Sequence, residues 1–247
     1  MNTLDSIIDD LVVANRILAA EEIVDAFGHI SVRHPERPDR YFLSRSRAPQ
    51  CVEPDDIMEF SLDGEAIDAR SRAPYFERFI HGGIYLAWPE ARSVVHSHSR
   101  AVIPFSVSHE PIRPLMQNCA SIGHAVPVWD SRSKFGDTDL MVTNMEMARD
   151  LAQAIGRNPT ALMRGHGSVA VGPSIRRAVF NAIKLQESAI FQKDVAQFDK
   201  VIYLSPGEIE KCRHLLDVAD RKPLGGIDRA WEYWCARAGM TFRPRSD

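Results

Sequence analysis

Two short segments, far apart in the chain, constrain the fold more than any other feature of the sequence. The first reads Ser-Val-Val-His-Ser-His and ends at His98, and the second reads Leu-Met-Arg-Gly-His-Gly around His166. In a β-strand residues i and i+2 project from the same face, so His96 and His98 point the same way after two valines. The glycines beside His166 let a second strand approach closely. We therefore expect a fold in which two strand ends bring three imidazoles to one point.

Three converging imidazoles are typical of a metal site. Imidazole is a common ligand of divalent cations, and three protein ligands leave coordination positions open for a substrate. We interpret His96, His98 and His166 as the ligands of a catalytic metal rather than a structural one. The alternative is that they are ordinary core or surface histidines, since the chain has nine. Imidazole ligands alone do not select strongly among Mn2+, Fe2+, Co2+ and Zn2+.

A carboxylate and a fourth histidine precede the first pair. Residues 75–88 are predicted to form a helix that runs into the strand of His96 with almost no linker, so we expect this helix beside the histidines. Glu77 could be a fourth ligand or a general acid/base, because a cation and partial burial tune the pKa of a carboxyl group. A salt bridge to a neighbouring arginine is the alternative. His81 lies one helical turn after Glu77, and we expect it to support the site from behind rather than bind the metal.

Polar residues early in the chain, and one beside the third histidine, are candidates for binding an anionic substrate. Arginine forks and serine hydroxyls suit a carboxylate or a phosphate, although a solvated basic loop is the alternative for the segment Ser-Arg-Ser-Arg. An arginine in the apolar strand before the third histidine needs an anionic partner. The candidate substrate-binding residues are His29, Ser44, Arg45, Arg47 and Arg164.

The overall composition excludes several classes of protein. A net charge of −3 over 247 residues gives no footprint for a polyanion, so we expect no nucleic-acid partner. No stretch approaches about 18 apolar residues, and the first residues are acidic, which argues against a membrane span and a secretory signal. The four cysteines show no CxxC spacing, which favours reduced thiols. We expect a cytoplasmic protein that acts on a small molecule without a membrane partner.

The pattern of apolar residues predicts a single α/β/α three-layer domain. Strands and helices do not alternate regularly, which favours a largely antiparallel central sheet over a doubly wound parallel one. No repeat or linker interrupts the chain, so we expect one domain over residues 1–247, with a core at about 5–200 and a C-terminal helical extension at about 205–240. Besides residues 75–88, periodicity and capping residues predict helices at 3–27, 144–156, 174–197, 206–219 and 228–239, and a hairpin at 161–171.

The ordered set of motifs resembles the class II aldolase/adducin family over about residues 5–200. The motifs are Gly-His-Ile-Ser-Val-Arg, Ser-Arg-Ser-Arg-Ala-Pro, Glu77-x-x-x-His81-x-x-x-Tyr85, Val-Val-His-Ser-His and Arg-Gly-His-Gly. By position, the resemblance implies that the three histidines bind the metal and that Glu77 is the acid/base. It also implies a class II aldolase-like fold and a homotetramer with active sites between adjacent subunits. Among the possible metals, the resemblance favours Mn2+.

Departures from the sugar-phosphate aldolases of the family point to one branch of it. Where those aldolases bind a phosphate with an Asn, a Thr-containing Gly-rich loop and a Ser-Ser pair, this sequence has His29, the loop 44–47 and Tyr75-Phe76. Imidazole and arginine donors beside aromatic walls suit a flat, carboxylated ring better than a phosphate. The sequence is most similar to the branch that contains 3-hydroxy-2-methylpyridine-4,5-dicarboxylate 4-decarboxylase and 3,4-dihydroxyphthalate decarboxylase.

This resemblance implies a metal-dependent carbon–carbon lyase, specifically a decarboxylase of an ortho-hydroxy aromatic or heteroaromatic acid, as used in aromatic compound catabolism. The metal would stabilise an enolate-like or phenolate-like intermediate, and Glu77 would transfer the proton. Three alternatives remain. The same site could cleave a sugar phosphate or sugar acid as an aldolase, or act as an iron-dependent oxygenase. A non-catalytic module like the head domain of adducin is the third, and the intact histidine triad argues against it.

Overall fold

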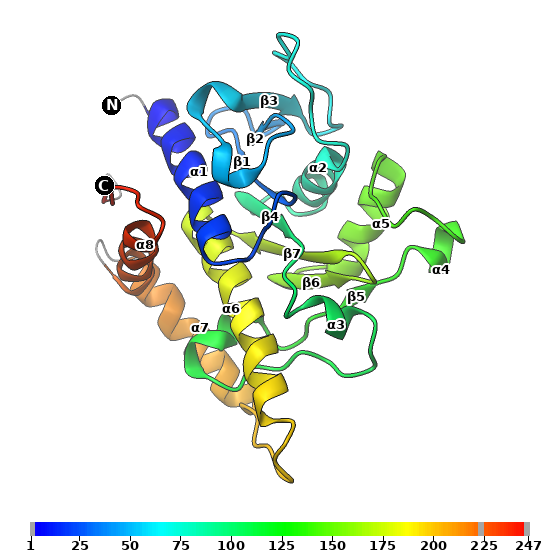
Figure 1. The fold of residues 1–247 in the computed structure, drawn as a ribbon, viewed down its shortest axis with the longest axis vertical. Helices are drawn as coiled ribbons and strands as arrows, with labels where there is room; N and C mark the ends of the chain where they lie inside the picture. The colour runs from blue at the N-terminus through cyan, green and yellow to red at the C-terminus, as the bar shows by residue number, and fades with distance from the viewer. Residues whose placement is uncertain (1–2, 222–224, 245–247) are drawn as a thin grey trace.

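A seven-stranded sheet lies between layers of helices in this computed structural model, which describes residues 3–221 and 225–244 (Figure 1). The strand order is β3-β2-β1-β4-β7-β6-β5, and all neighbouring strands are antiparallel except β5 and β6. The prediction of a largely antiparallel central sheet is therefore confirmed. The strands are β1 His29–Arg33, β2 Arg40–Ser44, β3 Ile57–Ser61, β4 Ser93–Ser97, β5 Val128–Trp129, β6 Thr160–Met163 and β7 Gly167–Gly172.

The helices cover both faces of this sheet. Figure 1 shows α1 and α6 on one side of the strands, and α2 and α5 on the other. The described α-helices are α1 Thr3–Ala20, α2 Arg78–Ala87, α3 Ile103–Ser106, α4 Arg132–Phe135, α5 Met145–Ile155, α6 Ile175–Val195, α7 Pro206–Asp220 and α8 Gly226–Arg237. Three short 3-10 helices, η1 Pro49–Cys51, η2 Pro54–Asp56 and η3 Gln117–Ile122, complete the described elements.

Three of the predicted helices begin where their capping residues indicate. Asn144, Ser174 and Ser205 each accept a hydrogen bond from the backbone N–H three residues later, which satisfies one of the free donors at a helix start. The helix at Ser205 also has the reciprocal bond from Glu208 and a proline in its first turn. Part of the predicted C-terminal extension, residues 222–224, lies outside the described residues.

Two hydrophobic clusters hold the three layers together, one on each face of the sheet. Neighbouring residues of the central strand β4 serve opposite clusters, because side chains alternate across a strand. Val95 packs in the cluster with α1, α6 and α8, whereas Val94 packs in the cluster with α2 and α5. His96 follows on the same face as Val94. The first predicted metal histidine therefore lies on the side of the sheet that α2 covers.

Helix α1 is shorter than predicted, because it ends at Ala20 and not at residue 27. The backbone N–H of Ile23 bonds to the oxygen of Leu18, that of Glu22 bonds to Ala19, and Glu22 has a φ of 57°. These are the bonds of a Schellman motif, which ends a helix with one left-handed residue. The fully buried Ile23 anchors this turn in the core. The chain after it is thereby free to cross the end of the sheet and reach His29.

Helix α2 begins at Arg78, three residues later than predicted. The hydroxyl of Tyr75 donates to the backbone oxygen of Arg47, which holds the segment before the helix against the loop after β2. Glu77 occupies the position just before the helix, with φ −91° and ψ 18°. The carboxylate that the sequence places on a helix therefore lies at the start of one.

Candidate metal centre and adjoining pocket

The pairing of β4 with β7 brings the predicted histidines together. In this register His96 lies opposite Val169 and Ser97 opposite Ser168, so the turn that carries His166 reaches the end of β4. Gly167 is required at this approach, since a Cβ atom there would lie 2.2 Å from the backbone oxygen of Ser97. A larger residue would push the two strand ends apart and separate the imidazoles.

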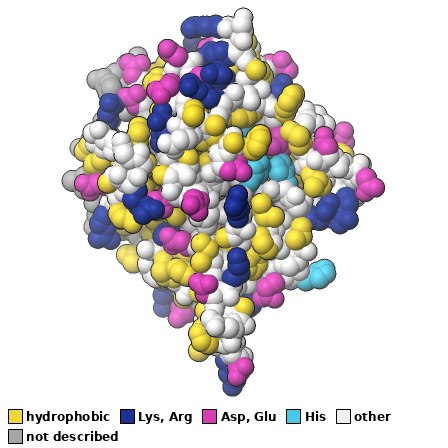
Figure 2. All heavy atoms as spheres, in the orientation of Figure 1, with side chains coloured by type: hydrophobic (Ala, Val, Ile, Leu, Met, Phe, Trp, Pro, Cys, Tyr) yellow, Lys and Arg dark blue, Asp and Glu magenta, His cyan; other side chains and the backbone are white. Residues whose placement is uncertain are grey.

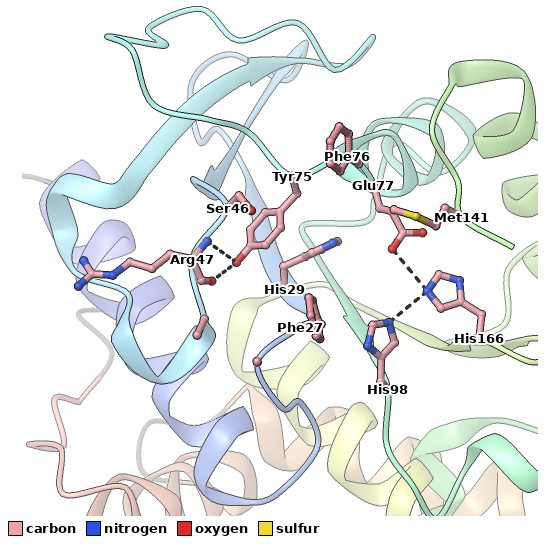
Figure 3. A pocket seen from close by; sticks show the side chains of 13 residues that line it. Phe27, His29, Ser46, Arg47, Tyr75, Phe76, Glu77, His98, Met141 and His166 are labelled. Atoms are coloured by element: carbon pink, nitrogen blue, oxygen red, sulfur yellow. Dashed lines mark hydrogen bonds and ion pairs between the residues drawn. The ribbon is translucent and has the colours of Figure 1, made fainter. Parts of the chain in front are cut away.

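The three histidines meet through the same ring nitrogen, and Figure 3 shows two of them, His98 and His166, pointing toward one another. The Nε2 atom of His98 lies 3.0 Å from Nε2 of His96 and 3.1 Å from Nε2 of His166. Together with a carboxylate oxygen of Glu77, one donor atom from each residue lies within 4.8 Å of all the others. Figure 2 shows histidine side chains gathered at one place on the surface, with hydrophobic and acidic side chains beside them.

The hydrogen-bond partners of the rings indicate what occupies this space. Nδ1 of His96 lies 3.2 Å from the oxygen of Ser168, and Nδ1 of His166 lies 3.0 Å from the oxygen of Leu140. A carbonyl only accepts, so Nδ1 carries the hydrogen in both rings and each Nε2 presents a lone pair. One hydrogen on His98 could bridge only one of these two contacts. The donor set therefore fits a cation at the shared point, with backbone carbonyls orienting its ligands.

Burial keeps the imidazole of His98 neutral. Burial first, and the neighbouring His96 and His166 second, lower the pKa of His98 to about 4. A neutral imidazole is the form that binds a metal. His98 is therefore in a state suited to coordination.

Glu77 completes the group as an ionised carboxylate. Its Oε2 lies 3.5 Å from Nε2 of His96 and 3.4 Å from Nε2 of His166, and its Oε1 accepts a 3.0 Å hydrogen bond from the backbone N–H of Val142. Burial by itself raises the pKa of this carboxyl, but charge and hydrogen bonding from His96 and His166, when these rings are protonated, outweigh burial and hold the pKa well below its ordinary value. A cation between neutral rings would lower the pKa in the same direction. The carboxylate is thus fixed beside the histidines in a form that can bind a cation or accept a proton.

A pocket of about 430 Å³ opens beside this group (Figure 3). Its walls are largely aromatic or apolar, and the metal group forms its polar end. The rings of His29 and Tyr75 lie 4.5 Å apart on one side, as expected for an aromatic wall. The lining residues are Ala26, Phe27, Gly28, His29, Ser46, Arg47, Ala48, Tyr75, Phe76, Glu77, His98, Met141 and His166.

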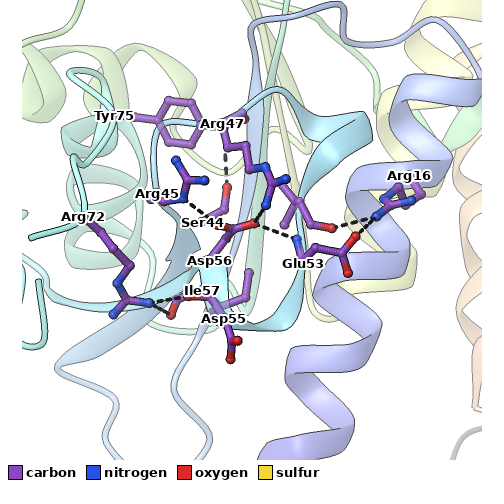
Figure 4. A network of polar contacts seen from close by, with 11 residues as sticks. Arg16, Ser44, Arg45, Arg47, Glu53, Asp55, Asp56, Ile57, Arg72 and Tyr75 are labelled. Carbon is purple, nitrogen blue, oxygen red and sulfur yellow. Dashed lines mark hydrogen bonds and ion pairs between the residues drawn. The ribbon is translucent and has the colours of Figure 1, made fainter. Parts of the chain in front are cut away.

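The two arginines of the predicted anion-binding loop are bound by an acid of the same chain (Figure 4). Arg45 Nε and Arg47 Nη1 each lie 2.5 Å from a carboxylate oxygen of the buried Asp56. Figure 3 shows the guanidinium of Arg47 pointing away from the pocket, which Arg47 lines with other atoms. Because the guanidinium forks already bind a carboxylate, this arrangement does not support direct substrate binding by Arg45 and Arg47.

The other two candidates outside the histidine group are also bound elsewhere. Arg164 Nε lies 2.8 Å from a carboxylate oxygen of Asp130, so the anionic partner that the sequence requires is an internal one. The hydroxyl of Ser44 is buried and lies 3.4 Å from the hydroxyl of Tyr75. Neither residue lines the pocket beside the metal group. Their predicted role in substrate binding stays a prediction from sequence, and these contacts do not favour it.

His29 lies at the pocket wall, and His81 lies behind it. His29 lies opposite His96 in the pairing of β1 with β4, and it lines the pocket. His81 is fully buried on α2 and its Nε2 lies 2.7 Å from Nδ1 of His29. Among the described residues, His81 is not part of the four-residue metal group.

Several residues of the site carry little signal in the sequence. Phe27 and Met141 line the pocket from loops that follow no periodic pattern. Asp56, which binds the two arginines, could have been considered because it caps a short helix only nine residues after Arg47.

Comparison with known proteins gives the family. Residues 9–192 match the Class II Aldolase and Adducin N-terminal domain. The chain is 36% identical over 242 residues to decarboxylase tropJ of Talaromyces stipitatus, covering 88% of each chain. It is 27% identical over 240 residues to 3,4-dihydroxyphthalate decarboxylase of a Terrabacter species, covering 92% of this chain and 94% of the relative. An aldolase II superfamily protein of Pseudomonas syringae has the same fold, with a TM-score of 0.79, 17% identity, and coverage of 96% and 94%.

The chain therefore belongs to the class II aldolase and adducin family. This match and the decarboxylase relatives confirm the family, the class II aldolase-like fold and the prediction of a carbon–carbon lyase. Within the part of the chain that the structure describes, no helix is both long and apolar enough to cross a membrane.

Proposed function

We propose that this protein is a divalent-metal-dependent decarboxylase of an ortho-hydroxy aromatic or heteroaromatic carboxylic acid. The observation that supports it most directly is the group of three converging Nε2 atoms and an ionised carboxylate beside an aromatic-walled pocket. Two relatives over most of the chain are named as decarboxylases, and one of them acts on 3,4-dihydroxyphthalate by its name. A flat ring with a hydroxyl beside its carboxylate matches both the walls and the polar end of this pocket.

His96, His98 and His166 would hold the cation, and Mn2+ is the metal we propose. Bound there, the cation would supply positive charge that stabilises the negative charge developing on the ortho oxygen of the substrate. The carbonyl groups of Ser168 and Leu140 keep two of the ligand rings oriented.

Glu77 is the proposed proton carrier. Because it is ionised, its carboxylate can take the proton of the ortho hydroxyl and deliver it to the ring carbon that bears the leaving carboxylate. The carbon–carbon bond then breaks, CO2 leaves, and the electron pair passes through the ring to the oxygen, which restores the aromatic ring as a phenolate. The bond from the Val142 N–H to Oε1 leaves Oε2 on the side of the histidines for this transfer.

We also propose that the protein is a homotetramer whose active sites lie between subunits, as the family resemblance implies. Two large aromatic side chains at the pocket support contact with a second copy, since Phe27 is 67% exposed and Phe76 is 75% exposed. Large exposed apolar groups gathered at one pocket commonly mark interfaces. Size-exclusion chromatography with light scattering measures the mass of the assembly. A monomer at assay concentrations would contradict the proposed homotetramer.

The reaction is tested by product analysis. Mn2+-loaded protein is incubated with a panel of ortho-hydroxy aromatic mono- and dicarboxylates and with a sugar phosphate, and CO2 and aldehyde are measured with and without oxygen. We expect CO2 from at least one aromatic acid, at the same rate without oxygen, and no aldehyde from the sugar phosphate. Aldehyde release without any CO2 would show an aldolase, and a requirement for oxygen would show an oxygenase.

A further inference from the structure

A line of buried polar side chains runs from the pocket wall into the protein interior. Nδ1 of His29 lies 2.7 Å from Nε2 of His81, and Nδ1 of His81 lies 2.6 Å from the hydroxyl of Ser31. The same hydroxyl lies 2.7 Å from the hydroxyl of Tyr85. All four side chains are at most 3% exposed. We call this line, from His29 through His81 and Ser31 to Tyr85, the buried chain.

The buried chain follows from matched periodicities of a strand and a helix. His29 and Ser31 are two residues apart on β1 and share the face that α2 covers, while His81 and Tyr85 are one turn apart on α2. Repeats of about 6.6 Å along a strand and about 6 Å along a helix are close enough for four side chains to interleave. The three hydrogen bonds are therefore a product of the fold and are present without a ligand.

The direction of the hydrogen bond at Tyr85 determines which ring nitrogen of His29 carries the hydrogen at the other end of the buried chain. A neutral imidazole has one N–H and one lone pair, so each histidine that donates at one nitrogen accepts at the other. The Tyr85 hydroxyl lies 2.7 Å from that of Ser31 and 3.5 Å from the backbone oxygen of Arg92. The shorter contact, together with the greater donor strength of a phenol, favours donation from Tyr85 to Ser31. Ser31 then donates to Nδ1 of His81, and His81 donates from Nε2 to Nδ1 of His29. The only hydrogen left on the ring of His29 is the one at Nε2.

That hydrogen faces the pocket. Nδ1 of His29 is bound to His81, whereas no partner among the described residues is found for Nε2, and His29 lines the pocket. Nearby donors are committed elsewhere, because the Tyr75 hydroxyl donates to Arg47 and the guanidinium groups of the loop bind Asp56. Glu77 lies in the same pocket as a fixed negative charge, which also favours an N–H over a lone pair on the side of His29 that faces it.

We propose that the buried chain holds His29 as the neutral tautomer with its hydrogen on Nε2, and that this N–H donates to a negatively charged oxygen of the substrate. Ser31, His81 and Tyr85 are positioning residues that act through His29. The substrate-binding part of this proposal rests on the proposed function, while the tautomer does not. A substrate that presents a carboxylate or phenolate oxygen at this wall is bound, and one that presents a donor there is rejected.

Neutron diffraction from deuterium-exchanged crystals tests the tautomer without any substrate. We expect deuterium on Nε2 of both His29 and His81, and the Ser31 deuterium directed at His81. Deuterium on Nδ1 of His29 would overturn the proposal whatever reaction the enzyme catalyses. In Ser31→Ala crystals, loss of the donor to His81 should leave mixed occupancy on the two nitrogens of His29. Unchanged full occupancy at Nε2 would show that the buried chain does not set the tautomer.

Kinetics test the contact with substrate. Loss of a hydrogen bond to a charged oxygen corresponds to about tenfold or more in affinity, so His29→Ala should raise KM by about that factor. His29→Gln should recover part of the loss, because its amide can still donate. Ser31→Ala and Tyr85→Phe should raise KM with a smaller effect on kcat. Ser188→Ala is the matched control, since Ser188 is fully buried on α6, donates to the backbone oxygen of Lys184 and does not line the pocket. If KM of His29→Ala equals that of the wild type, His29 does not contact the substrate.

Discussion

Two groups of basic side chains lie at the same pocket, and they differ in whether the chain supplies their partners. In the arginine group, Arg45 and Arg47 share the carboxylate of Asp56, so both guanidinium groups already have a partner within the fold. In the histidine group, the Nε2 atoms of His96 and His166 converge with that of His98, and among the described residues Glu77 is the carboxylate that joins them. The difference teaches that basic residues at a pocket are not equivalent. The group whose bonding is incomplete is the one suited to a ligand.

The largest effect is expected from removing a metal ligand. His96→Ala should reduce bound metal from about one ion per chain to background and abolish turnover, because two imidazoles do not replace a three-histidine site. Metal content by plasma mass spectrometry and CO2 release measure this. His34→Ala is the control, since His34 is also buried but lies outside the metal group. Full metal content in His96→Ala would show that His96 does not bind the metal.

Glu77→Gln should separate metal binding from proton transfer. The amide keeps the size of the side chain and can still accept from Val142, so we expect most of the metal to remain. The rate should fall by about 100-fold or more, because an amide does not carry a proton. Glu59→Gln, on the edge strand β3, is the control for loss of a carboxylate. Turnover near that of the wild type would make Glu77 a structural residue.

Asp56→Asn should affect stability more than catalysis. Burial raises the pKa of Asp56, but the Glu53 backbone N–H and the two arginines outweigh burial and lower it. We expect a loss of about 1 kcal/mol in the free energy of unfolding, a modest figure because both arginines are about one third exposed and can bind water instead. Urea denaturation measures it. Loss of metal from Asp56→Asn would show that the arginine group and the histidine group are not independent.

The carboxyl group of Asp56 also makes the free energy of unfolding depend on pH, in a direction that its lowered pKa determines. Because the pKa of Asp56 is lowered in the folded state, its stabilisation is present above the ordinary value of 3.8 and is lost as pH falls below it. The stability difference between wild type and Asp56→Asn should be largest near neutral pH and shrink below about pH 4. A difference that grew on acidification would contradict the lowered pKa.

The smallest effect is expected from replacing Arg47. Arg47→Gln should change KM by much less than the roughly tenfold expected for a lost charged hydrogen bond to substrate, because the guanidinium binds Asp56 and points away from the pocket. Steady-state kinetics on the best substrate of the panel check this. A rise of tenfold or more would restore the role predicted from sequence.

The parts of the molecule that sequence predicts well follow from short-range periodicity. The spacing of His96 and His98, and the side-chain caps at Asn144 and Ser205, are properties of a few neighbouring residues. Partners of the arginines depend on how a loop folds back, and no spacing places Asp56 under Arg45. The register that sets His29 beside His96 is likewise a property of the whole sheet, so the buried chain behind His29 could not be derived from sequence spacing alone.

The most direct test of the metal centre is anomalous diffraction from crystals grown with Mn2+. We predict one strong peak within bonding distance of Nε2 of each of His96, His98 and His166. Three rings with separate partners, and no anomalous peak between them, would contradict the account.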